Sequence, residues 1–335
     1  MKNVEATAAR HENCSCEMNH PQLWTCLHFP ALPLEILTRA DPVETALAIA
    51  MGSTRPRIVA ANLPARSRGI SAGMSVSAAL ALDPGLIVHP RNPSMETQTL
   101  VEIAQWALQF SPVLSLPAAD AVLLEVGAGL SLFDGLERLL AMLRAGLRAL
   151  GFTAAVSAAP TPTAALMLAR AGQAQAITDV GSLERELAGL PVDTLICDES
   201  IPATLADLGV HRVGGLLQLP RDGLARRFGP SLVDALDRAV GGQPDPQKPF
   251  IAPEHFASRL ELPAPAYEAH ALLFGAKRLI AAFAGWLAGR GLGVMRLRIE
   301  LRHEDCAPST LILNLSTPSR DPAHLITLLR ARFER

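Results

Sequence analysis

Short apolar runs alternate with longer amphipathic stretches through the first 190 residues, and this alternation limits the fold more than any other feature. The apolar runs have strand length, and the longer stretches repeat apolar residues with the 3.6-residue period of a helix. Predicted strands cover residues 23–29, 57–61, 121–126 and 153–158, and predicted helices cover 75–82, 94–110, 132–150 and 163–171. This order predicts an α/β or α+β core, in which helices cover a sheet, rather than a helical bundle.

The pattern of predicted elements changes twice after residue 190. Residues 191–242 contain short helix-like phrases joined by tight turns, and residues 243–255 contain four prolines, which is typical of a linker. Residues 256–335 predict a strand at 259–262, a helix at 269–290, strands at 294–302 and 309–316, and a helix at 322–332. Because no further strand follows, we expect a partial α/β domain at this end.

The composition is that of a folded protein, with 49% apolar and 19% charged residues. Residues 1–22 are polar and predict a flexible tail. Cys14 and Cys16 lie in this tail between two histidines, but their spacing matches no standard zinc pattern, so we prefer a frayed tail to a metal site. The five cysteines are scattered and no long uncharged apolar run is present, so we expect a cytoplasmic protein without a disulfide framework or membrane span.

Three stretches, in order, carry a resemblance to a known family. Residues 57–74, which read RIVAANLPARSRGISAGM, resemble the fingers segment of the Y-family (lesion-bypass) DNA polymerases. Residues 121–126 resemble the catalytic palm strand, and residues 205–241 resemble the thumb. The resemblance implies a right-hand architecture with a palm (23–32 and 93–190), small fingers (33–92), a helical thumb (191–242), a linker (243–255) and a little-finger-like domain (256–335), the last incomplete.

A subgroup of that family, the ImuB-type proteins, is the most similar. The phrases CLHFPALPLE from Cys26, WALQFSP from Trp106 and PSRDPAH from Pro318 carry this likeness. It implies a non-catalytic accessory role in error-prone translesion synthesis and SOS mutagenesis. The implied partners are a sliding clamp, a RecA-like accessory protein, an error-prone C-family polymerase and, weakly, DNA. Residues 218–220 begin like a clamp-binding peptide, but the stretch is typical of a turn that links two helices.

The resemblance also locates the positions of the catalytic metal ligands. Nucleotidyl transfer uses two divalent cations held by carboxylates, and active family members supply three. In this chain those positions fall on Cys26, Asp120 and Ala121, so one carboxylate remains. A thiol is a soft ligand that suits Mg²⁺ poorly, and alanine offers no ligand. We therefore expect no metal site, no cofactor and no polymerase activity.

The nucleotide pocket departs from the family pattern as well. The aromatic steric gate falls on Ala31, and the tyrosine that packs on the nucleotide falls on Leu63. Arg66 is interpreted as a remnant of the triphosphate contact, and a structural surface arginine is the plain alternative. Several elements of one site are thus changed together.

Binding to DNA does not depend on the metal ligands. The net charge of −2 is unpromising for a nucleic-acid binder. Residues 221–335 are mildly basic, with 16 Lys and Arg against 12 Asp and Glu. The candidate contacts in the thumb and last domain are Arg221, Arg226, Arg227, Lys277, Arg278, Arg296, Arg298 and Arg302. The last three have the same strand parity and are expected on one face, although an ordinary solvated face has similar composition.

Three alternatives stay open at this point. A working lesion-bypass polymerase would need Mg²⁺ at Asp120 and Glu125, although their parity places them on opposite sides of a strand. A DNA-binding module without a partner role would keep only the basic residues. A transition-metal site of Cys26, His28 and Asp120 is conceivable, but a buried cysteine is more often simple packing.

Overall fold

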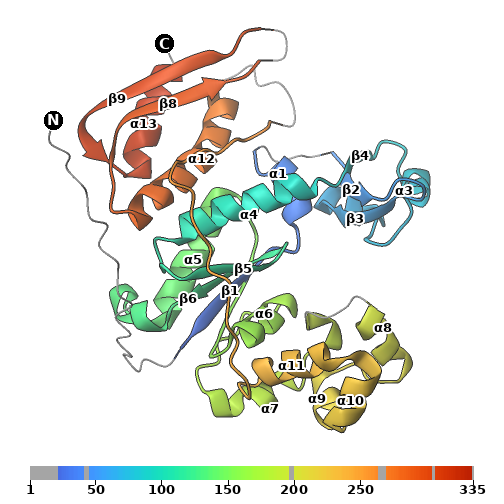
Figure 1. The fold of residues 1–335 in the computed structure, drawn as a ribbon. Helices are drawn as coiled ribbons and strands as arrows, with labels where there is room; N and C mark the ends of the chain where they lie inside the picture. The colour runs from blue at the N-terminus through green and yellow to red at the C-terminus, as the bar shows by residue number, and fades with distance from the viewer. Residues whose placement is uncertain (1–21, 41–44, 196–199, 263–268, 304–305, 334–335) are drawn as a thin grey trace, which may run out of the picture.

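The computed structural model describes residues 22–40, 45–195, 200–262, 269–303 and 306–333. Cys14 and Cys16 lie outside the described residues. The chain forms an α+β structure, as the sequence predicts, and its elements fall into four groups along the chain (Figure 1). We name these parts palm, fingers, thumb and little-finger-like domain.

The palm is built on a four-stranded antiparallel sheet in the order β5-β6-β1-β7. Its elements are β1 Trp24–His28, α4 Pro93–Ala107, β5 Leu114–Ala118, β6 Ala121–Glu125, α5 Leu136–Leu150, β7 Ala155–Ala159 and α6 Pro162–Arg170, with 3-10 turns at Gly127–Phe133 and Val180–Ser182 and a short α7 at Leu183–Leu187.

Helices cover both faces of the palm sheet (Figure 1). On one face, Leu27 and Val122 share an apolar cluster with Ile103 of α4 and with buried leucines of α5. On the other face, Cys26 and Leu123 pack in a second cluster with α6 and the thumb. Alternate residues of β1 and β6 thus point into two separate cores, as the two-residue period of a strand requires.

Local sequence signals explain where the palm helices begin and end. The side chain of Asn92 accepts a hydrogen bond from the backbone of Met95 (3.1 Å), and Thr161 caps α6 in the same way. Gly151 ends α5 in the left-handed conformation (φ 87°), as its position after the predicted helix suggests. The predicted helix at 132–150 begins four residues late, because Asp134 and Gly135 have positive φ and separate it from the 3-10 turn before it.

The fingers are a small unit that projects from the palm (Figure 1). A mixed sheet in the order β3-β2-β4 is formed by β2 Leu47–Met51, β3 Arg57–Ala61 and β4 Ile87–Pro90. Helices α2 Leu63–Ser67 and α3 Val76–Leu82 contribute to one small core, and α1 Leu32–Thr38 joins the unit to β1. Asn62 caps α2 and also bonds to the backbone of Leu47, so one buried side chain ties α2 to the sheet.

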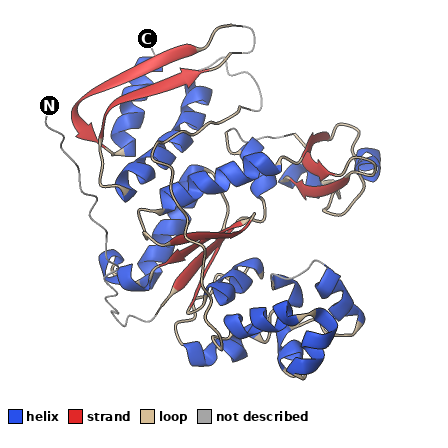
Figure 2. Cartoon of the chain, in the orientation of Figure 1, coloured by secondary structure: helices blue, strands red, loops and turns tan. Residues whose placement is uncertain are grey.

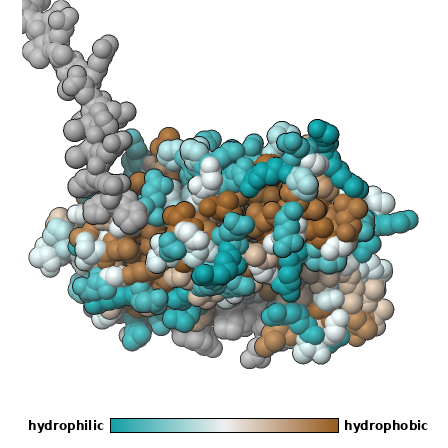
Figure 3. Space-filling view, turned by 90° about the horizontal axis from the view of Figure 1, so that it is seen from below, coloured by the Kyte–Doolittle hydropathy of each residue, from teal (hydrophilic) through white to brown (hydrophobic). Residues whose placement is uncertain are grey.

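The described part of the thumb consists of short helices joined by turns, and it lies at the bottom of Figure 2. Its elements are a 3-10 turn at Val192–Thr194, α8 Ser200–Asp207, α9 Val213–Leu217, α10 Arg221–Phe228 and α11 Pro230–Ala239. They share one apolar cluster with α6 and the palm sheet, so thumb and palm have a common core. Seen from below, the molecule has a band of apolar residues between polar ones (Figure 3).

The little-finger-like domain consists of α12 Ala269–Gly289, β8 Val294–Leu301, β9 Ser309–Ser319 and α13 Pro322–Phe333. Strands β8 and β9 pair antiparallel, and α12 contacts α13 as well as α4 and α5 of the palm. Helix α12 is long and apolar enough, by length and composition alone, to cross a membrane. The core helix of a folded domain has the same properties, and α12 packs against helices of both domains here.

The predicted strand at 259–262 is wrong, because these residues form no strand in the structure. Leu260 and Leu262 instead lie against α12, where they approach Gly275. Just before them, the Ser258 hydroxyl donates to a carboxylate oxygen of Glu102 on α4 (2.7 Å). The apolar and polar side chains of this segment therefore contact α12 and α4, and the segment does not pair with a sheet edge.

Candidate functional site

The three positions that the family resemblance implies as metal ligands lie close to one another, at one end of the palm sheet. Strands β1 and β6 pair antiparallel, with His28 opposite Ala121 and Cys26 opposite Leu123. Asp120 directly precedes β6, and its carbonyl accepts a hydrogen bond from the backbone of Phe29 (2.8 Å). Strand register thus brings together residues that are far apart in the sequence.

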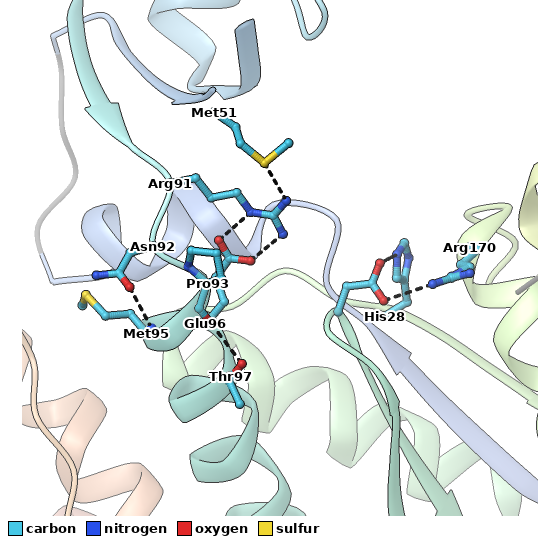
Figure 4. Close-up of polar contacts among 10 residues, drawn as sticks. His28, Met51, Arg91, Asn92, Pro93, Met95, Glu96, Thr97 and Arg170 are labelled. Carbon is cyan, nitrogen blue, oxygen red and sulfur yellow. Dashed lines mark hydrogen bonds and ion pairs between the residues drawn. The ribbon is translucent and has the colours of Figure 1, made fainter. Parts of the chain in front are cut away.

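The Asp120 carboxylate already has two partners within the chain. One oxygen lies 3.3 Å from an Arg170 guanidinium nitrogen, at the end of α6, and the other lies 3.4 Å from His28 Nε2 (Figure 4). Burial alone would raise the pKa of Asp120, but the hydrogen bond from His28 and the charge of Arg170 outweigh it, so the pKa is lowered. The surviving carboxylate is therefore charged, and the guanidinium of Arg170 balances that charge.

Cys26 lies in the palm core, where its side chain is fully buried. Burial raises the pKa of its thiol far above the usual value, and the smaller opposing effect of the Arg170 charge does not cancel this. The thiolate is the form that binds metals, so this protonated thiol is a poor ligand. Ala121, next to Asp120, is also buried and contributes only a methyl group.

These residues do not fit a pair of divalent cations. One carboxylate, one protonated thiol and one methyl group occupy the three positions, and Arg170 places a positive charge against the carboxylate. Within the described ranges, no group of three or more His, Cys, Asp and Glu side chains is arranged to hold a metal ion. The transition-metal alternative of Cys26, His28 and Asp120 has the contact between His28 and Asp120 that it requires, but the buried Cys26 thiol is protonated.

Glu125, the second acid of the polymerase alternative, lies at the opposite end of β6 from Asp120. One of its carboxylate oxygens accepts hydrogen bonds from the backbone of Leu23 (3.3 Å) and Gly127 (2.9 Å). Glu125 is thus used to hold the ends of β1 and β6 and does not meet Asp120.

An arginine that sequence reasoning missed lies where fingers and palm meet. Arg91 follows β4, and its guanidinium makes two hydrogen bonds to Glu96 of α4 (2.8 and 2.7 Å; Figure 4). The hydrogen bond to Glu96 raises the pKa of Arg91, burial opposes this, and the negative charges of Glu96 and Asp120 add to the increase. Glu96 is buried, so this bidentate pair fixes the fingers to the palm beside the site. The sequence contains one signal for this pair: Glu96 lies in the first turn of the predicted helix 94–110, five residues after Arg91.

The other predicted positions lie before α1 and on the fingers. Ala31 precedes α1, where its carbonyl accepts from the backbone of Leu34 and Glu35. Leu63 and Arg66 lie on α2 of the fingers, and both side chains are exposed. A role of Arg66 toward a triphosphate stays a prediction.

The structure places Arg278 differently from expectation. Its guanidinium donates to the backbone carbonyls of Arg39 (3.1 Å), Arg148 (2.8 Å) and Ala149 (3.0 Å). Burial lowers the pKa of Arg278, and the three carbonyls hold it at the junction of α12 and the palm. The side chain joins two domains and is not available as a DNA contact.

The arginines expected on one face of β8 share that face with an acid. Arg302 lies just beyond the strand and pairs with Glu300 (3.0 Å), which also lies 3.9 Å from Arg298. Glu300 shares the parity of these arginines, so the face carries an acid in its centre. Of the remaining candidates, Arg221 pairs with Asp237, whereas Arg226, Arg227, Lys277 and Arg296 are exposed and stay predictions.

Residues 30–170 match the family model described as impB/mucB/samB, the domain of the Y-family polymerases. Over this domain the chain is similar to the Y-family polymerases. It is 29% identical over 272 residues to the protein ImuB of Caulobacter vibrioides, a match that covers 79% of this chain and 58% of that relative. It is 28% identical over 178 residues to DNA polymerase IV of Pelotomaculum thermopropionicum, covering 51% of this chain and 44% of that protein. The chain thus spans less than two thirds of the length of these relatives.

Solved structures confirm the right-hand architecture of the chain. The crystal structure of DinB from Sulfolobus solfataricus has a TM-score of 0.54 and 18% identity, covering 92% of this chain and 93% of that one. An insertion ternary complex of Dbh DNA polymerase has a TM-score of 0.51 and 16% identity, with 92% and 93% covered. At this identity the likeness shows the fold alone.

The lowered pKa of Asp120 predicts a specific pH dependence for the Asp120→Asn variant. A carboxyl group whose folded pKa is depressed stabilises the fold above its unfolded pKa, and this contribution is lost as the pH falls through the folded value. The variant should therefore be less stable than the parent at neutral pH, and the difference should shrink below about pH 4. Urea unfolding between neutral and acid pH measures it, and a difference that grows toward acid pH would contradict the assignment.

Proposed function

We propose that this chain is a non-catalytic accessory protein in error-prone translesion DNA synthesis and the response to DNA damage. The observation that carries the proposal is the pairing of Asp120 with Arg170 and His28. Phosphoryl transfer in this family depends on positioning and charge supplied by metal ions, so a site that balances its last carboxylate internally lacks the basis for that chemistry. The likeness to ImuB supports a role in the same process.

The accessory role needs partners, and we propose the set that the resemblance implies: a sliding clamp, a RecA-like accessory protein and an error-prone C-family polymerase, with weak binding to DNA. Each is tested by retention on the immobilised chain with nuclease present. Retention of the polymerase or clamp without DNA supports a scaffold. Retention of primer–template alone, in the absence of nuclease, would favour the DNA-binding module instead.

An active lesion-bypass polymerase is the second candidate, favoured by the family match and by the retained Asp120. Against it stands the position of Glu125, which bonds to backbone groups at the far end of β6. The two candidates differ in whether the purified chain can extend a primer.

Primer extension with Mg²⁺ and separately with Mn²⁺ should give no incorporation by the purified chain, because no pair of cations is held. The Asp120→Ala variant is the matched control. Any trace signal that persists in this variant comes from a contaminating polymerase. Template-directed extension that disappears in Asp120→Ala would overturn the proposal and establish the second candidate.

A further inference from the structure

The outer strands of a sheet carry unpaired backbone groups that can bind a strand of another chain, and the palm sheet is protected on both sides. The edge of β5 is covered by the linker, because the backbone N–H of Phe250 donates to the carbonyl of Leu114 (2.7 Å). The edge of β7 is covered by residues 175–177, which both donate to and accept from the backbone of Ala158.

The fingers sheet and the β8 side of the last domain are protected as well. Ile58 of β3 exchanges backbone hydrogen bonds with residues 73 and 74 (both 2.8 Å). Strand β4 is only four residues long and ends in Pro90, which has no N–H to donate. Strand β8 is charged along its exposed face, and charges discourage pairing with another strand. The charged residues of β8 are Arg296, Arg298 and Glu300.

Strand β9 has none of these protections among the residues that the structure describes. It runs from Ser309 to Ser319, and residues 309–317 contain neither a charged residue nor a proline. Apart from the ladder with β8, the backbone of residues 310–318 forms no hydrogen bond with any other described residue. Figure 1 shows β9 at the outer margin of the molecule. Its edge is therefore a template for a further strand.

The segment before α12 does not supply that strand. Ser258 donates to Glu102 of α4, and Leu260 and Leu262 approach Gly275 of α12. These contacts hold the segment on helices. Within the described ranges, no part of this copy of the chain is thus placed to pair with the open edge of β9.

We propose that the open edge of β9 pairs antiparallel with β9 of a second copy of this chain, in a sheet of the order β8-β9-β9-β8. A strand suits this edge when apolar residues alternate along it and no charge interrupts them, because its side chains must continue both faces of the sheet. Strand β9 itself meets both conditions. On one face Leu311, Leu313 and Leu315 pack with α12 and α13, and on the other Thr310, Ile312, Asn314 and Ser316 are exposed.

The contrast between β9 and β8 also favours a closed pair of molecules. A two-fold axis at β9 uses the open edge of both copies at once, so β8 becomes the outer strand on each side. The charges of β8 then discourage the addition of a third molecule. Pairing through β9 brings no like charges together, because the strand has none. The inference does not depend on the Asp120 site, which lies in the palm.

The test measures the mass of the whole chain by sedimentation velocity between about 1 and 100 µM. A contact between two strands is small, so we expect a reversible change from monomer to dimer as the concentration rises. Ile312→Lys with Asn314→Lys should weaken dimerisation roughly tenfold or more. Whether the two-fold axis passes at residue 312, 313 or 314, a lysine then faces a lysine of the other copy. Both side chains are exposed, so the unfolding midpoint should be unchanged.

A charge-reversed variant separates loss of pairing from loss of folding. Ile312→Glu with Asn314→Glu should also be monomeric by itself, and an equimolar mixture with the lysine variant should recover the dimer, because opposite charges then face each other. Leu208→Lys with Leu219→Lys is the matched control, since it places the same charge on exposed leucines of the thumb and should leave dimerisation unchanged.

Three results would overturn the proposal. The first is a chain that stays monomeric at every concentration, including one that captures an extended peptide of another protein, because the edge would then serve a different partner. The second is a dimer that persists in the lysine variant or is not recovered in the mixture. The third is growth beyond the dimer, because a closed two-fold pair leaves only the charged β8 strands at its edges.

Discussion

Replacing Gly146 by alanine is expected to destabilise the protein by about 1–3 kcal/mol, the usual cost of overpacking a core. The same exchange inside a helix normally stabilises it, so the expected sign is reversed. Gly146 lies in α5, and a Cβ atom there would be 2.2 Å from Cζ2 of Trp106. The ring has no room to retreat, because Gly285 of α12 closes its other edge, where a Cβ atom would also lie 2.2 Å away. Thermal or urea unfolding measures the change.

Gly223→Ala is the matched control for that experiment. Gly223 also lies inside a helix, α10, but a Cβ atom there meets nothing within 4 Å. This variant should gain about 0.5–1 kcal/mol from helix propensity alone. The cost of Gly146→Ala should also fall when Trp106→Leu provides space, as a double-mutant cycle measures. A neutral or stabilising Gly146→Ala would mean that Trp106 is not confined between α5 and α12.

The confinement of Trp106 shows why the little-finger-like domain is seated on the palm. Gly289 of α12 also approaches the backbone of Leu108, and Arg278 completes the contact with its three carbonyl partners. Small residues let α12 come close to α4, and the arginine donates to the carbonyls of Arg148 and Ala149 at the end of α5, where few intrahelical donors remain. The domain is therefore attached through a close-packed contact as well as through the linker.

Periodicity predicted the elements whose own sequence decides their structure. The strand at 121–126 and the helix before Gly151 were readable, because apolar spacing and a glycine stop signal are local. The strand at 259–262 was predicted on the same grounds and is absent, because its apolar residues have a helix to pack on. Burial against a distant partner overrides local propensity, and a single sequence contains no mark of that partner.

Contacts with distant partners were also the part of the candidate site that the sequence did not predict. The resemblance placed Cys26, Asp120 and Ala121 at one site, and strand register brings them together. It gave no sign that Arg170, far along the chain at the end of α6, would meet Asp120, or that Arg278 would bond to backbone carbonyls. Such contacts depend on where a helix ends in space, which is decided by packing.

Cys26→Asp, which returns a carboxylate to the first ligand position, is expected to cost about 3 kcal/mol of stability at neutral pH, because it buries a charge that is poorly compensated. The Cys26 side chain is fully buried, and the same burial that raises the pKa of the thiol will raise the pKa of a carboxyl group there. A raised folded pKa favours the protonated form. The loss relative to the parent should therefore be small below about pH 4 and should grow as the pH rises through the folded value.

Urea unfolding across this pH range measures the effect, and Cys26→Ser, which is neutral and similar in size, should show a loss that does not depend on pH. Repeating the unfolding of Cys26→Asp with added Mg²⁺ tests whether the site can still bind a divalent cation. If the pocket still held divalent cations, the new carboxylate and Asp120 together would bind Mg²⁺, and the ion would restore stability to Cys26→Asp at neutral pH. We expect no such recovery, because the Arg170 guanidinium already occupies the Asp120 carboxylate that such a cation would need. Recovery would show that the pairing with Arg170 yields to a metal, and the proposed loss of catalysis would then have to rest on the missing ligands alone.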